Sequence, residues 1–170
     1  MYIFNKSLLI AVLLVLSISS SYAQNKISDK TIKTELVGVW QDAPSVGSGM
    51  SDNYRFFADG TYKFNYNEMD AAKRLLSHEG KWSVAEGKLV LVIDTVVLLI
   101  GGKLVEATGS AASEFEIEGG EVIRKKIMPA EKLTLGLGAF LKEELHNTTT
   151  IGDVKYWKLS SDPDVYGGSS

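Results

Sequence analysis

Residues 54–67, YRFFADGTYKFNYN, decide the fold class of this chain. Asp59-Gly60 divides the stretch, and Asp-Gly between two runs of β-forming residues is the strongest short-range signal for a β-hairpin. In the second run, Tyr62, Phe64 and Tyr66 alternate with polar residues, which places three aromatic rings on one face of a strand. The stretch therefore predicts an antiparallel hairpin with one apolar face.

The chain on both sides of this hairpin continues as short runs of β-type residues separated by turns such as Glu86-Gly87 and Gly119-Gly120. No gap holds an amphipathic helix long enough for a parallel crossover. Eleven such runs are present, and their spacing predicts a sheet of roughly nine or ten strands. The runs are 36–41, 54–57, 61–67, 80–85, 88–94, 96–100, 103–108, 114–118, 121–128, 132–137 and 154–159. We expect an all-β domain, a single antiparallel up-and-down β-barrel of about eight to ten strands.

The segments between these runs are less decided. Residues 24–35 are a polar lead-in that forms either a short helix or a loose segment, and residues 67–77 predict a hairpin connection with a helical turn. Residues 138–146 fit a two-turn helix or a strand; we favour a strand that frays into a loop over 147–152. The barrel is expected over 36–160, followed by a polar tail at 161–170.

The first 23 residues have the composition of a secretory signal peptide. Lys6 precedes the apolar run Leu8–Leu16, and Ser21 and Ala23 place small residues before a cut between Ala23 and Gln24. The apolar run is about half of the roughly 20 residues that a spanning helix needs, so an uncleaved anchor is the less favoured alternative. We expect an exported protein, periplasmic or secreted, with no membrane span after cleavage.

Composition excludes several classes of protein. The chain has 170 residues, no Cys and a net charge of −3. Without Cys there is no disulfide scaffold, no cysteine nucleophile and no lipid anchor at the cleavage site. The acidic balance argues against a nucleic-acid partner.

Gly38-Val39-Trp40 in the first run resembles the opening motif of the lipocalins. Residues 54–62, 80–84, 87–91 and 156–159 are similar, in this order, to strands of small bacterial lipocalin-like domains of exported proteins. The resemblance implies a calyx-shaped barrel with Trp40 packed across its closed end. In larger lipocalins an Arg caps this Trp, and Arg55 and Arg124 are both open candidates for that position here.

Aromatic side chains are the candidate ligand contacts. They either line an apolar cavity or fill the interior, since a barrel of about eight strands is only just wide enough for its own side chains. If a pocket exists, the tyrosine hydroxyls orient the ligand, Arg124 pairs with a carboxylate, and the loop at 46–50 is a natural lid. The candidate residues are Trp40, Tyr62, Phe64, Tyr66, Trp82, Arg124 and Trp157.

Motifs for catalysis or metal binding are not found. The chain has 2 His, and His78 and His146 both lie in or beside expected loops, so we interpret them as solvated surface residues. There is no nucleophile elbow, P-loop, dinucleotide fingerprint or His-Glu-x-x-His pattern. We therefore expect no enzyme, no metal and no cofactor.

Two hypotheses for function follow. The first is an exported lipocalin-like domain that binds a small apolar or amphipathic ligand in its barrel. The alternative is an interaction protein, such as an inhibitor, immunity or envelope-assembly factor, with a packed barrel and a protein partner on its outer surface. The second predicts an exposed apolar patch near 96–100 or 140–145.

Overall fold

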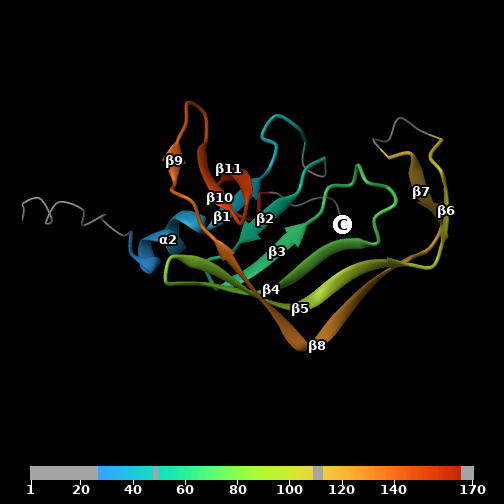
Figure 1. Cartoon of the computed structure of the whole chain (residues 1–170), viewed down its shortest axis with the longest axis horizontal. Helices are drawn as coiled ribbons and strands as arrows, with labels where there is room; N and C mark the ends of the chain where they lie inside the picture. Colours follow the sequence, from blue (N-terminus) through green and yellow to red (C-terminus); the bar gives the residue numbers. More distant parts are fainter. Residues whose placement is uncertain (1–26, 48–49, 109–112, 166–170) are drawn as a thin grey trace, which may run out of the picture.

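The computed structural model describes residues 27–47, 50–108 and 113–165. The predicted signal peptide at 1–23 lies outside the described residues, as does part of the expected lid at 46–50. The elements, shown in Figure 1, are α2 (Asp29–Leu36), β1 (Gly38–Gln41), β2 (Asn53–Phe56), β3 (Thr61–Asn65), β4 (Leu75–Ala85), β5 (Lys88–Ile100), β6 (Lys103–Glu106), β7 (Phe115–Glu118), β8 (Glu121–Gly136), β9 (Leu141–Lys142), β10 (Asn147–Ile151) and β11 (Val154–Ser160). No described helix has the length and apolar character needed to cross a membrane.

The main sheet is antiparallel throughout, which confirms the all-β prediction. Its nine strands run in the order β8-β5-β4-β3-β2-β1-β11-β10-β9, and β6 and β7 form a separate two-stranded sheet. No sheet among the described residues is closed into a barrel. The two ends of the main sheet nevertheless approach each other, because Leu137 forms an isolated antiparallel bridge with Ile151.

Two long strands replace four predicted runs. The expected runs 88–94 and 96–100 are one strand, β5, and the runs 121–128 and 132–137 are one strand, β8. The β5–β8 pairing shifts register between Ile93 and Thr95, where residues 127–130 of β8 leave the ladder. β8 bends sharply midway along its length, as Figure 1 shows. Because pairing resumes on both sides of this shift, each strand continues through the break that the sequence suggests.

Three local predictions were wrong or incomplete. β4 begins at Leu75 instead of residue 80, because the chain turns earlier, over 68–72. Residues 147–152 were expected to be a loop, but Asn147–Ile151 is β10, paired with β11. The segment before it forms only the two-residue strand β9. The lead-in forms a helix, α2, so its helical alternative is confirmed.

The helix closes one end of the apolar core. Ile32 and Leu36 of α2 are buried, and the Leu36 carbonyl accepts a hydrogen bond of 2.8 Å from Trp40 Nε1. Gly38 precedes that Trp with φ of 128°, and a Cβ there would lie 2.1 Å from the Ser160 carbonyl oxygen. The glycine of the Gly-x-Trp motif is thus required by the close approach of β11.

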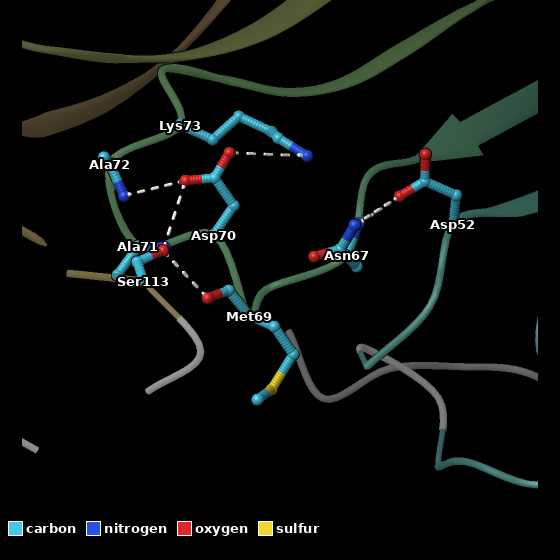
Figure 2. Close-up of polar contacts among 8 residues, drawn as sticks. All are labelled: Asp52, Asn67, Met69, Asp70, Ala71, Ala72, Lys73 and Ser113. Atoms are coloured by element: carbon cyan, nitrogen blue, oxygen red, sulfur yellow. Dashed lines mark hydrogen bonds and ion pairs between the residues drawn. The ribbon is translucent and has the colours of Figure 1, made fainter. Parts of the chain in front are cut away.

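The β6–β7 hairpin lies at the end of the molecule away from α2 (Figure 1) and folds against the β3–β4 connection. Figure 2 shows this contact, in which Ser113 Oγ donates to the Met69 carbonyl at 3.1 Å and accepts from the Ala71 amide at 3.1 Å. The Ile117 amide also donates to the Ala71 carbonyl at 3.1 Å. With a longer contact of 3.4 Å from Ser113 Oγ to Asp70, four hydrogen bonds hold the hairpin and its loop to this connection.

Candidate functional site

The candidate site is the aromatic cluster on the inner face of β1–β4 and β11. Ring centroids lie 4.4 Å apart for Tyr54 and Phe64, 5.1 Å for Phe56 and Trp82, and 5.3 Å for Tyr54 and Tyr156. Alternation along each strand places these rings on one face, as the hairpin pattern predicts. We define the aromatic cluster as Trp40, Tyr54, Phe56, Tyr62, Phe64, Tyr66, His78, Trp82 and Tyr156.

His78 belongs to this cluster, so its interpretation as a solvated loop residue was wrong. It lies in β4 with 7% of its surface exposed. Its ring stacks on Phe64 at 4.9 Å, and its Nδ1 lies 2.9 Å from the Tyr62 hydroxyl. Burial lowers the pKa of His78 to about 4, which keeps the imidazole neutral at physiological pH.

Three tyrosine hydroxyls in the cluster have no hydrogen-bond partner among the described residues. They belong to Tyr54 and Tyr156, with exposed fractions of 6% and 5%, and to the half-buried Tyr66. Every solvent-inaccessible side-chain nitrogen or oxygen in the described ranges does have a partner, so each of these hydroxyls reaches accessible space. Burial raises the pKa of all three above the usual value, and they therefore stay protonated.

Two carboxylates, those of Asp42 and Asp52, lie where the chain leaves β1 and where it enters β2. The Asp42 amide donates to the Asp52 carbonyl at 3.2 Å, which holds the two residues opposite each other. One Asp52 oxygen accepts from the Asn67 amide at 2.8 Å and from its side chain at 2.7 Å (Figure 2). Asp52 adds to the raised pKa of all three tyrosines, and Asp42 adds to that of Tyr156.

Most of the predicted ligand contacts come together. Trp40, Tyr62, Phe64 and Trp82 are buried in the core, and Tyr66 packs against it. Both buried indoles use their N–H, since Trp82 Nε1 donates to the Phe57 carbonyl at 3.0 Å in addition to the Trp40 bond described above.

Two predicted contacts lie elsewhere. Trp157 is adjacent to the inward-facing Tyr156 in β11 and therefore points to the opposite face, where Lys155 Nζ lies 4.9 Å from its ring centroid. Arg124 forms a two-pronged ion pair with Glu79, at 2.7 and 2.6 Å, and its side chain is 62% exposed. Neither residue joins the aromatic cluster.

The cation that lies over the Trp40 ring is a lysine. Lys158 Nζ lies 5.5 Å from the Trp40 ring centroid and donates to the Glu35 carbonyl at 2.6 Å. Burial lowers the pKa of Lys158. Arg55 instead donates to the Pro163 carbonyl at 2.8 Å. A cation thus covers the Trp of the first strand, but neither Arg candidate supplies it.

Residues that sequence reasoning missed as site residues are Tyr54, Tyr156 and His78. The first two lie inside predicted strands. Tyr54 is two residues from Phe56, and Tyr156 is two residues from Lys158, so each pair shares one strand face, and this spacing was the available signal. His78 stands two residues before Gly80 and four before Trp82, so extending the alternation of this strand backward would have placed it on the inner face.

Other candidate sites are weaker. In the described ranges, no group of three or more His, Cys, Asp and Glu side chains is placed to hold a metal ion. A surface pocket of about 350 Å³ lies between residues 142–147 and 158–161. Its lining is mainly charged and polar, with Leu145 87% exposed at its rim. The aromatic cluster is therefore the better candidate for a ligand site.

Comparisons with known proteins find no match: no family model, no curated protein and no solved structure resembles this chain closely enough to be reported.

Proposed function

We propose that this chain is an exported lipocalin-like β-barrel that binds a small amphipathic molecule and catalyses no reaction. The three unpartnered tyrosine hydroxyls within a buried aromatic cluster carry the proposal. Each of these hydroxyls reaches accessible space and has no protein partner in the described ranges, so all three are free to form hydrogen bonds with a bound molecule. A ligand with a polar end and an apolar body satisfies the hydroxyls and contacts the rings.

The barrel itself is supported by the contacts between the two ends of the main sheet. Beside the Leu137–Ile151 bridge, the Gly138 amide donates to the Thr150 carbonyl at 2.8 Å, and the Gly152 amide donates to the Gly136 carbonyl at 2.9 Å. These bonds continue the antiparallel pattern from the end of β8 to β10. In the barrel that we propose, the sheet closes at this junction, which begins to pair its two edges.

Native mass spectrometry of the protein purified from an exporting host tests this function. We expect a reproducible extra mass that denaturation releases, and a polypeptide mass that begins at Gln24, the residue after the expected cleavage. The triple variant Tyr54→Phe, Tyr66→Phe and Tyr156→Phe keeps the rings but removes the hydroxyls. It should lower ligand occupancy about tenfold, because several hydrogen bonds are lost.

Thr34→Val is the matched control, since it also removes a hydroxyl, on the exposed part of α2, whose only hydrogen bond is local. Its occupancy should equal that of the unmodified protein. A bare polypeptide mass that persists after exposure to fatty acids, alkylamines, haem and isoprenoids would contradict the proposed function.

A protein partner is the second candidate, and the β6–β7 hairpin favours it. Leu104 and Phe115 are 59% and 45% exposed. They lie on one face of the hairpin, because Leu104 pairs with Ile117 and Phe115 pairs with Glu106. Leu104→Lys should prevent co-purification of such a partner and leave the bound small molecule in place. If the partner remains bound to this variant, the hairpin is not its docking surface.

A further inference from the structure

One face of the main sheet carries an excess of lysine side chains. Strands β3, β4, β5 and β8 lie side by side in that sheet (Figure 1). Tyr62, Trp82 and Leu89 of the first three strands are buried in the core. Side chains alternate between the two faces of a strand, so the lysine adjacent to each of them points to the outer face. These lysines are Lys63, Lys81 and Lys88.

Strand β8 adds two lysines to the same face. Ile127 packs against the core, so the adjacent Lys126 points outward. Lys132 pairs across the ladder with Val92, which is adjacent to the buried Leu91 and therefore also points outward. Four of the five lysines are exposed, and Lys63 is half-buried. We define the lysine face by the side chains of Lys63, Lys81, Lys88, Lys126 and Lys132.

Neighbouring carboxylates leave these five charges unpaired. None of the five lysines forms an ion pair with a described residue. Glu79 lies opposite Lys63 on this face, but both of its carboxylate oxygens accept from Arg124, at 2.7 and 2.6 Å. Asp59, in the turn before β3, accepts from the amide and the hydroxyl of Thr61. A chain with a net charge of −3 therefore keeps five positive charges together on one face.

Apolar side chains lie between the lysines. Val90 and Val92 of β5 are half-exposed on the lysine face, and Val92 pairs with Lys81 on one side and with Lys132 on the other. Neighbouring strands lie about 4.8 Å apart, so the face extends about 15 Å across the strands. An array of ammonium groups that extends in two dimensions, with apolar side chains between them, fits a layer of lipid head groups better than a single linear polyanion.

We propose that the lysine face docks this protein on a membrane surface that contains anionic phospholipid. The ammonium groups contact the lipid phosphates, while the lysine stems and the two valines contact the apolar part of the interface. The attraction acts within about 10 Å of the surface at about 0.1 M salt. The lysine face lies on the opposite side of these strands from the aromatic cluster, so this docking does not depend on the proposed ligand.

Co-sedimentation of the full exported protein with vesicles tests the docking. One set of vesicles contains phosphatidylcholine alone, and the other contains equal parts of phosphatidylcholine and phosphatidylglycerol. We expect the protein to bind only the vesicles with phosphatidylglycerol. Raising the salt from about 0.1 M to about 1 M should release it, because the screening length falls from about 10 Å to about 3 Å.

The double variant Lys81→Gln and Lys132→Gln removes two charges from the lysine face. Each lysine near an anionic surface strengthens binding about fivefold, so this variant should bind about twentyfold more weakly. The matched control, Lys30→Gln and Lys103→Gln, makes the same change of charge at exposed positions of α2 and β6. Its binding should change by less than about twofold. Both double variants should unfold in urea at the same midpoint as the unmodified protein, since the exchanged side chains are exposed.

Three outcomes would overturn the docking proposal, and none of them bears on the proposed ligand-binding function. The first is a failure to bind vesicles with phosphatidylglycerol; binding of a single-stranded oligonucleotide in that case would assign the face to a linear polyanion. The second is equal weakening in the two double variants, because net charge would then drive the binding. The third is unchanged binding of the Lys81→Gln and Lys132→Gln variant, which would place the contact on another surface.

Discussion

The buried imidazole of His78 links folding to pH at the scale of a single residue. In the folded chain burial holds its pKa at about 4, whereas an unfolded His titrates near 6.5. The unfolded state therefore binds more protons between these two values, so the free energy of unfolding falls as pH drops through this window. Above about pH 7 His78 is neutral in both states and adds almost nothing to the pH dependence of the free energy of unfolding.

We predict that the free energy of unfolding falls by about 2 kcal/mol between pH 7 and pH 5 through His78 alone. The variant His78→Phe keeps a ring against Phe64 and removes the titration, so its fall over this range should be smaller by that amount. Urea unfolding at both pH values measures the difference. His146→Gln, outside the cluster, should behave like the unmodified protein. If its free energy of unfolding falls between pH 7 and pH 5 by as little as that of His78→Phe, the effect belongs to another group.

A second residue-scale prediction concerns the turn between β4 and β5. Glu86 has φ of 56° and Gly87 has φ of 75°, so both central residues of the turn adopt the left-handed region. Asn tolerates this region better than Glu, and Asn-Gly is the preferred pair for such a turn. Glu86→Asn should raise the free energy of unfolding by roughly 0.5 kcal/mol, measured by urea unfolding. Glu121→Asn, in the extended β8, should give no gain.

At the scale of elements, the pairing of β4 with β5 depends on a glycine. The ladder shifts register between Glu79 and Gly80, and a Cβ at Gly80 would lie 1.9 Å from the Val92 carbonyl oxygen. That neighbour is backbone in the middle of a paired strand, so it cannot move without breaking ladder hydrogen bonds. The register shift and the glycine therefore require each other.

Gly80→Ala should lower the free energy of unfolding by about 3 kcal/mol, because overpacking here displaces backbone. Gly136→Ala is the matched control, since nothing lies within 4 Å of a Cβ built at that position of β8. Its stability should change by less than about 0.5 kcal/mol. Equal stabilities of the two variants in urea unfolding would show that β5 lies farther from β4 than the structure places it.

At the scale of the whole molecule, the main question is whether the sheet closes. The bonds that join its ends involve the amides of Gly138 and Gly152, which lie outside the strands. If closure persists in solution, both amides should exchange with deuterium at least about a hundredfold more slowly than an unstructured peptide, as measured by NMR. Leu91 in the centre of the sheet is the reference for full protection. Exchange of both glycines at the unstructured rate would contradict a closed barrel.

The sequence by itself determined the antiparallel β class, the hairpin around Asp59-Gly60 and the inward face that carries Tyr62, Phe64 and Tyr66. These features are local, since strand alternation and turn chemistry act over a few residues. Only the tertiary structure decided that β5 and β8 run on through their predicted breaks, that β4 begins early enough to include His78, and that Lys158 covers Trp40. Each of these depends on partners distant along the chain, because register and burial are set by the neighbouring strand rather than by the residue's own neighbours.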